Sequence, residues 1–298
     1  MNPVVIDTDP GLDDAVAILF ALASGRFDIL GITTVAGNLG IDVTTRNAGR
    51  LLALLGRPDI PVAAGATAPL DRPGIDEAAI HGDDGLGGTR LPEPRQPALP
   101  DAVTWLEETL MAHPAGGVDI LALGPLTNIA ALIRRSPEAA RRIGRIIAMG
   151  GAVAERGNVG PRSEFNFAYD PEAAEIVFAF GLDLTIVPLD VTRKVRADAA
   201  YLERLRAGPI AARAAGDLIA AYFQDGRQSR PLHDPCVMLY AVAPELFGID
   251  KLAIGIDLAD DPGALEEVGS GAPLKVALAI DAEAAKDLLA TGLLNEPA

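Results

Sequence analysis

The sequence has 298 residues, of which 49% are hydrophobic, so the chain can bury a substantial core and is not a disordered protein. Its formal net charge of −16 argues against a protein that binds nucleic acid, because no basic excess is available to displace counterions from phosphates. The single cysteine, Cys236, excludes an intrachain disulfide and is typical of a reducing compartment.

The sequence carries no sign of export or of a membrane span. No apolar run reaches the roughly 20 residues that a span needs, and no basic region precedes the first apolar residues. We therefore expect a cytoplasmic protein that has neither a membrane nor a nucleic acid as its partner. A nucleophilic role for Cys236 is an alternative, but its position between Pro235 and an apolar run favours the core.

The first elements of the chain bring carboxylates to one corner. Residues 4–6 predict a short buried strand, a Pro-Gly pair ends it, and the apolar run 16–22 predicts a helix that begins near Asp13. The carboxylates that gather at this corner are those of Asp7, Asp9, Asp13 and Asp14. Partly buried carboxylates repel one another, and a hard cation such as Ca²⁺ or Mg²⁺ removes the conflict. The alternative is that Asp13 caps the helix and the other aspartates are solvated. One helix end can use at most about two of the four carboxylates, so this alternative does not explain why all four gather here.

Strands and helices then alternate. Residues 27–36 predict a second strand, residues 42–55 a helix and residues 60–64 a third strand. This alternation is typical of an α/β protein with a mostly parallel open sheet flanked by helices. Ligands of such sheets bind outside the carboxyl ends of the strands, where the first aspartates lie and where Asn38 follows the second strand.

The regular pattern lapses between residues 66 and 100, which are rich in Pro, Gly and acidic residues. A long irregular loop in a compact domain is usually functional or mobile. His81 lies in this loop, and two interpretations stay open at this point. Either His81 contacts a ligand, or it is a surface residue of a mobile loop.

Beyond this loop the pattern resumes. Helices are predicted for residues 101–112, 171–180, 198–206, 210–223 and 282–289, and from about residues 128 and 235. Strands are predicted for residues 118–123, 145–149, 184–189, and for a closing pair at 251–258 and 274–281 at the edge or on a subsidiary layer. We expect helices 198–206 and 210–223 to form a flap over the sheet, followed by a basic connection at 224–230. No linker divides the chain, so residues 1–298 are predicted to be a single domain.

Polar residues from distant parts of the chain map to one edge of the predicted sheet. They are Asp7, Asp9, Asp13, Asp14, Asn38, Asn158, Glu164, Asn166, His233 and Asp234. His233 adds an imidazole, the side chain most readily poised as an acid near neutral pH, beside the carboxylate of Asp234. The alternative for His233 is a core histidine that a neighbouring carboxylate satisfies.

With these motifs the chain resembles the inosine-uridine type nucleoside hydrolases, enzymes that cleave the N-glycosidic bond of ribonucleosides. The resemblance extends in register from about residue 3 to about residue 245, and more weakly to the end. It rests above all on the signature DTDPGLDDA at residues 7–15. Further motifs are TTVAGN at 33–38, HG at 81–82, LTN at 126–128, MGG at 149–151, EFN at 164–166 and HDP at 233–235.

The resemblance implies one Ca²⁺ held by Asp9, Asp14, Asp234 and the main-chain carbonyl of Leu123. It also implies that Asp9 is the general base for the attacking water, that His233 protonates the leaving base and that Asp7 supports the cluster. The positions implied to bind the substrate are Asp13, Asn38, Asn158, Glu164 and Asn166 at the ribose hydroxyls and Met149 along the sugar. We further expect His81 and Phe165 at the nucleobase. The implied partners are a ribonucleoside and further copies of the chain, in a dimer or tetramer.

The nucleobase preference depends on departures from the family pattern. His81 stands where the purine-specific subgroup has tryptophan, which argues against stacking a purine between two aromatic rings. The aromatic residues left to cover a base are Phe165, Tyr222 and Phe223. We therefore expect a pocket that accepts pyrimidines or is broad.

Two other functions agree less well with the sequence. A haloacid-dehalogenase-type phosphatase also begins with a strand and Asp-x-Asp, but it needs a threonine two residues after the second aspartate, where this chain has Gly11. A catalytically inactive module that binds a sugar or Ca²⁺ would require a broken base or acid. Both Asp9 and His233 are intact, which favours the enzyme.

Overall fold

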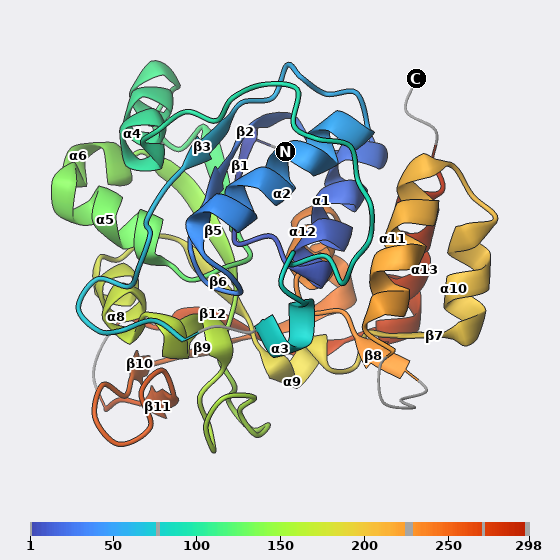
Figure 1. Cartoon of the computed structure of the whole chain (residues 1–298). Helices are drawn as coiled ribbons and strands as arrows, with labels where there is room; N and C mark the ends of the chain where they lie inside the picture. Colours follow the sequence, from blue (N-terminus) through green and yellow to red (C-terminus); the bar gives the residue numbers. More distant parts are fainter. Residues whose placement is uncertain (1, 76–77, 224–228, 270–271, 296–298) are drawn as a thin grey trace.

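The computed structural model describes residues 2–75, 78–223, 229–269 and 272–295. Its main feature is an open sheet of eight strands in the order β3-β2-β1-β4-β5-β6-β12-β9 (Figure 1). These strands are β1 (Val4–Thr8), β2 (Ile29–Thr34), β3 (Val62–Ala64), β4 (Val118–Ala122), β5 (Ile143–Met149), β6 (Leu184–Val187), β9 (Phe247–Leu252) and β12 (Leu274–Ile280). All neighbours pair in parallel except β12 and β9. The predicted α/β fold is confirmed.

Helices cover both faces of the sheet (Figure 1). One face carries α1 (Leu12–Ala23), α2 (Ile41–Leu54), α10 (Ala199–Arg206), α11 (Ile210–Ala221), α12 (Pro235–Val242) and α13 (Ala282–Leu293). The other carries α4 (Ala102–Ala112), α5 (Thr127–Arg135), α6 (Pro137–Ala140) and α8 (Pro171–Ala179). Every residue of α1 is buried, as expected for a helix that is apolar on all sides. Among the described residues, no helix combines the length and apolar character that a membrane crossing requires.

The predicted strand 251–258 was wrong in its bounds. β9 starts at Phe247, and β10 (Ile254–Ile256) pairs with β11 (Leu265–Glu267) in a separate two-stranded sheet. In the edge strand β9, Phe247 and Ile249 alternate with exposed residues, but Lys251 interrupts this alternation, so the local pattern is too short to define the strand. Its antiparallel pairing with β12 fixes it instead, and the predicted partnership at the sheet edge is confirmed.

The segment predicted as a flap forms the two helices α10 and α11. They pack on α1 and α13 and belong to the helical layer on that face of the sheet. β7 (Arg196–Asp198) and β8 (Ser229–Pro231) flank them as a two-stranded ribbon. Most of the predicted basic connection, residues 224–228, lies outside the described residues. Four short α-helices of the described residues were not predicted: α3 (Ala78–His81), α6 (Pro137–Ala140), α7 (Phe165–Tyr169) and α9 (Leu189–Thr192).

Asp170 joins three segments behind the site. Its buried carboxylate accepts hydrogen bonds from the amides of Ala173 at 3.0 Å and Leu70 at 2.9 Å, and from the hydroxyl of Thr127 at 2.8 Å. Burial raises the pKa of Asp170 above its ordinary value. The carboxylate thus caps α8 and ties it to the start of α5 and to the loop after β3.

We expect Asp170→Ala to lower the free energy of unfolding by about 3 kcal/mol, because it removes a helix cap and leaves buried donors without an acceptor. Urea denaturation followed by circular dichroism measures the change. Asp170→Asn is the matched control, since its amide oxygen still accepts, and it should lose less. A loss below about 1 kcal/mol in Asp170→Ala would contradict the assignment.

Candidate active site

The site lies where the sheet reverses its winding. β1 and β4 are neighbours, yet β1 leads to α1 on one face and β4 leads to α5 on the other. The connections therefore separate and leave a crevice at the carboxyl ends of the two strands. Asp7 and Asp9 lie at the end of β1, and Leu123 directly follows β4. This is the edge that the sequence predicted.

Two glycines enclose the carboxylate of Asp9. A Cβ atom built on Gly37 would lie 2.1 Å from Asp9 Oδ2, and one built on Gly124 would lie 2.4 Å from Asp9 Oδ1. Neither position leaves room for a side chain, so both backbones approach the carboxylate directly. Asp9 is 1% exposed, and its Oδ1 has no hydrogen-bond partner among the described residues. A buried carboxylate oxygen without a partner is costly unless a ligand completes it.

Asn38 connects Asp9 to Asp14. Its main-chain amide donates to Asp9 Oδ2 at 2.7 Å, and its side-chain amide donates to the Asp9 carbonyl and to Asp14 Oδ2, each at 3.1 Å. Thr8 Oγ1 donates to the other oxygen of Asp14 at 2.6 Å. Burial raises the pKa of Asp9 well above its ordinary value, and repulsion from Asp14 adds to this.

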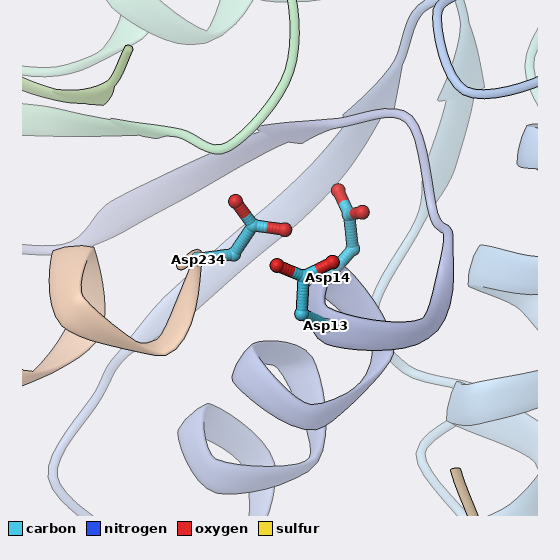
Figure 2. A group of neighbouring side chains, drawn as sticks. All are labelled: Asp13, Asp14 and Asp234. Carbon is cyan, nitrogen blue, oxygen red and sulfur yellow. The ribbon is translucent and has the colours of Figure 1, made fainter. Parts of the chain in front are cut away.

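Three carboxylates, that of Asp14 among them, converge near Asp9. Oxygens of Asp13 and Asp14, from the first turn of α1, and of Asp234, which precedes α12, all lie within 4.8 Å of one another (Figure 2). Burial raises the pKa values of Asp14 and Asp234, and the charge of Asp13 raises both further. Because Ca²⁺ binds oxygens at about 2.4 Å, ligands of one ion lie no more than about 5 Å apart. The cluster is consistent with the Ca²⁺ site typical of the family that the sequence resembles.

The three clustered carboxylates differ in one member from the predicted carboxylate ligands of Ca²⁺, because Asp13 replaces Asp9. Asp13 belongs to the cluster by distance, whereas Asp9 lies behind it, close enough for its charge to raise the pKa of Asp234. Leu123 lines the same cavity, and its carbonyl accepts a hydrogen bond from Asn166 Nδ2 at 2.6 Å. The predicted ligand roles of Asp9 and Leu123 stay predictions.

Asp7 lies beneath the cluster. Its Oδ1 accepts hydrogen bonds from Thr33 Oγ1 at 2.5 Å and from Asn128 Nδ2 at 2.8 Å. Its Oδ2 has no partner among the described residues, and burial raises its pKa to about 6. Since Asp7 does not line the cavity, a supporting position fits better than contact with a substrate.

One wall of the cavity is built around Glu164, which caps α7. Its Oε1 accepts from the Asn166 amide at 3.0 Å, its Oε2 accepts from the Gly151 amide at 2.9 Å, and burial raises its pKa to about 7. Asn166 Nδ2 donates to the Met149 carbonyl at 3.1 Å, and Asn158 Oδ1 accepts from the Phe165 amide at 2.9 Å. These contacts fix the side chains that the sequence assigned to ribose.

Two histidines and a tyrosine lie at another part of the cavity. His81 is 5% exposed, so the interpretation as a surface residue was wrong. His81 Nδ1 accepts from the Leu12 amide at 3.0 Å, which places the proton of the neutral ring on Nε2. Burial lowers the pKa of His81, which favours this neutral form. Tyr222 packs edge-on against the ring, with centroids 5.9 Å apart, and its hydroxyl donates to Asp13 Oδ1 at 2.5 Å.

His233 is half-buried, and its Nδ1 lies 2.8 Å from Thr192 Oγ1. Burial lowers the pKa of His233. When Thr192 donates to Nδ1, the proton of the neutral ring lies on Nε2, the form that can donate a hydrogen bond to a ligand. The alternative of a core histidine satisfied by a carboxylate finds no support in this contact, because the partner is a hydroxyl.

A cavity of about 360 Å³ unites these groups, and this volume is within the range of small-molecule sites. Eleven of the fourteen predicted site residues line it: Asp13, Asn38, His81, Leu123, Met149, Asn158, Glu164, Phe165, Asn166, His233 and Asp234. The other three, Asp7, Asp9 and Asp14, are buried behind them.

Several lining or supporting residues were not predicted. Tyr222 was named only as an aromatic that covers a base, without its hydrogen bond to Asp13. Thr192 ends the short helix α9, and Arg193 follows it and lines the cavity. Thr192 lies 41 residues before His233, so nothing in the local sequence signals their contact.

The chain is similar to known proteins along nearly its whole length. Residues 4–287 match the family model of the inosine-uridine preferring nucleoside hydrolases. The pyrimidine-specific ribonucleoside hydrolase RihA of Citrobacter koseri is 45% identical over 263 residues, which cover 86% of this chain and 84% of the relative. A solved plant nucleoside hydrolase, PpNRh1, is 34% identical with a TM-score of 0.89 and coverage of 98% of this chain and 99% of its own. The purine-preferring ribonucleoside hydrolase of Gardnerella vaginalis is 28% identical with a TM-score of 0.91, covering 98% of both chains.

The chain therefore belongs to the inosine-uridine preferring nucleoside hydrolase family. It is a ribonucleoside hydrolase, an enzyme that acts on N-ribosyl bonds.

Proposed function

We propose that the protein uses Ca²⁺ to hydrolyse pyrimidine ribonucleosides to ribose and free base. The observation that supports it most is a single cavity lined both by aspartates of the buried cluster and by two imidazoles, whose pKa values burial lowers. A sugar held on the carboxylates would present its glycosidic bond to the imidazoles. This arrangement suits a reaction that needs a base on one side of the bond and an acid on the other.

In the proposed reaction the ribose hydroxyls bind to the acidic and amide side chains of the cavity: Asp13, Asn38, Asn158, Glu164 and Asn166. Hydrogen bonds from backbone amides hold Glu164 and Asn158 in place, so the sugar meets a preorganised surface. As the bond to the base breaks, positive charge develops on the sugar. The buried carboxylates stabilise this charge more strongly than water would.

Asp9, Asp14, Asp234 and the Leu123 carbonyl would hold Ca²⁺, with Asp13 close by. When bound, Ca²⁺ orients the ribose and makes a water molecule easier to deprotonate. Asp9 then takes the proton of the attacking water on Oδ1, the oxygen that has no partner within the described residues.

His233 donates its Nε2 proton to the departing nucleobase, while Thr192 holds the opposite ring nitrogen. His81 is the second imidazole at this end, and its Nε2–H suits a hydrogen bond to a carbonyl oxygen of the base. Phe165 and Tyr222 supply the aromatic surface. A pyrimidine needs less stacking area than a purine, which agrees with this modest surface.

The relatives support the pyrimidine preference. The relative named as pyrimidine-specific is 45% identical, whereas the structure named as purine-preferring is 28% identical. We expect kcat/KM to be highest for uridine or cytidine, lower for inosine and lowest for guanosine. A reducing-sugar assay over this nucleoside panel measures the order, and a clear preference for guanosine would contradict it.

The same assay separates hydrolysis from phosphorolysis. We expect equal rates with and without inorganic phosphate, because the side chains assigned to the sugar are carboxylates and amides, which do not favour an anionic nucleophile. Rates that depend on phosphate would make the enzyme a phosphorylase.

We expect about one tightly bound Ca²⁺ per chain, since the clustered carboxylates repel one another without a cation. Elemental analysis of the purified protein measures the metal. Removing it should abolish activity and lower the melting temperature, because a ligand that binds only the folded state stabilises it. Added Ca²⁺ should restore both. Full activity in verified metal-free protein would contradict the proposal.

A further inference from the structure

Three arginines, Arg193, Arg196 and Arg230, line the same cavity as the aspartates. Asp13 and Asp234 are buried, whereas Arg196 is exposed and the other two arginines are half-buried. Exposure therefore places the carboxylates on the floor of the cavity and the arginines at its rim. A basic rim contrasts with a chain whose formal net charge is −16, which otherwise repels anions.

Neighbouring groups fix the guanidinium groups at the rim. Arg193 donates to the carbonyls of Arg156 at 2.6 Å and Gly157 at 3.0 Å, and pairs with Glu155 at 3.1 Å. These contacts hold it against the loop that leads to Asn158. Its charge is thus partly offset by one carboxylate.

Arg196 and Arg230 lie on the paired strands β7 and β8. Arg196 donates from Nε to Ser229 Oγ and from Nη2 to the Ser229 carbonyl, each at 2.9 Å. Both acceptors are uncharged, so these hydrogen bonds do not neutralise the guanidinium. Its Nη1 makes no hydrogen bond within the part of the chain that the structure describes. The guanidinium of Arg230 lies 5.4 Å from the centroid of the Tyr222 ring.

The arginines lie close to the imidazole end of the cavity. Arg193 follows Thr192, whose Oγ1 lies 2.8 Å from His233 Nδ1. Arg230 lies over the ring of Tyr222, which packs edge-on against His81. Both imidazoles belong to the nucleobase end under the proposed function, on which the present inference rests. An anionic group drawn to the rim would therefore lie on the base and not on the sugar.

We propose that the pocket accepts a pyrimidine ribonucleoside whose ring carries a negatively charged substituent such as a carboxylate. Arginine stays charged at every physiological pH and offers paired N–H donors that match the two oxygens of a carboxylate. The acidic floor takes the hydroxyls of the sugar, and the basic rim takes the anion. A substrate that has an uncharged sugar with hydroxyl groups at one end and an anionic group at the other thus fits the distribution of charge in the cavity.

The test compares 5-carboxyuridine with uridine-5-carboxamide, which has nearly the same shape and no charge. We expect kcat/KM to be about tenfold higher for the carboxylate, the effect of one charge-assisted hydrogen bond at a partly exposed site. Calorimetric dissociation constants, measured with the Asp9→Asn variant to prevent turnover, should show the same ratio. Arg196→Gln should reduce the ratio to below about twofold. Arg206→Gln, in an exposed arginine of α10, is the control and should keep the full ratio.

A carboxylate that is turned over and bound no better than the carboxamide would overturn the inference. So would a gain for uridine 5′-monophosphate over uridine that depends on Arg196, with none for the carboxylate, because the rim would then bind a phosphate on the sugar. If no nucleoside is hydrolysed, the proposed function fails by itself. The ratio of the two dissociation constants then decides the inference alone.

Discussion

Replacing Asp9 by Asn is expected to lower kcat for uridine by about 10³-fold and to change KM by less than about threefold. The side chain keeps its size, and its amide oxygen can still accept from the Asn38 amide, so the enclosure between Gly37 and Gly124 is preserved. What is lost is the ability to take a proton at the buried Oδ1 position. Such a group acts mainly in the transition state, which is why kcat falls and KM does not rise.

The measurement is steady-state kinetics on uridine, with bound Ca²⁺ and melting temperature determined for each variant. Metal content is essential, because Asp9 is also a proposed ligand, and a variant that retains Ca²⁺ isolates its role as base. Asp42→Asn, in the exposed first turn of α2, is the matched control and should behave as the parent. A variant that keeps its metal and most of its kcat would refute the assignment of Asp9 as general base.

The sheet and the aspartate corner were predictable because they depend on local patterns. Apolar runs with turns at regular spacing identify β1, β2 and β4, and the geometry of a parallel sheet brings their carboxyl ends together. Asp9 and Asn38 could therefore be placed at one edge without knowledge of any contact. The hydrogen bonds between them agree with that placement.

The environment of His81 was not predictable in the same way. The irregular loop gives no periodic signal, and the ring is held by Leu12, 69 residues away in the sequence, and by Tyr222. Tyr222 in turn reaches Asp13 across 209 residues. Contacts of this kind depend on how α11 packs against α1, which no local pattern encodes.

The short helix α9 shows a second limit. Its four residues, LDVT, include β-branched side chains that disfavour a helix, so propensity alone gives no helix there. It forms because Asp190 accepts from the amides of Val153 and Ala154, each at 2.8 Å, which anchors it to the loop after β5. This anchor brings Thr192 to His233 and Arg193 to the loop that carries Asn158.

His233→Ala is expected to lower kcat/KM for uridine by about 10³-fold, within the range for loss of a general acid, and to leave p-nitrophenyl riboside within about threefold of the parent. Uracil is a poor leaving group and departs faster when it receives a proton. p-Nitrophenolate is stable as an anion and needs none. The two substrates share the ribose, so they depend equally on the carboxylates and the amides that bind it.

The comparison is made on the same enzyme preparation, by absorbance for p-nitrophenolate and by the reducing-sugar assay for uridine. His113→Ala is the control, because this histidine lies at the end of α4, away from the cavity lining, and both substrates should be unaffected. Thr192→Val removes the hydroxyl that holds His233 Nδ1, and we expect a smaller loss, again confined to uridine. An equal loss on both substrates in His233→Ala would show that His233 does not act on the leaving group. The assignment would then move to His81, the other imidazole of the cavity, or to departure of the base without a proton, and a selective loss in His81→Ala would indicate the former.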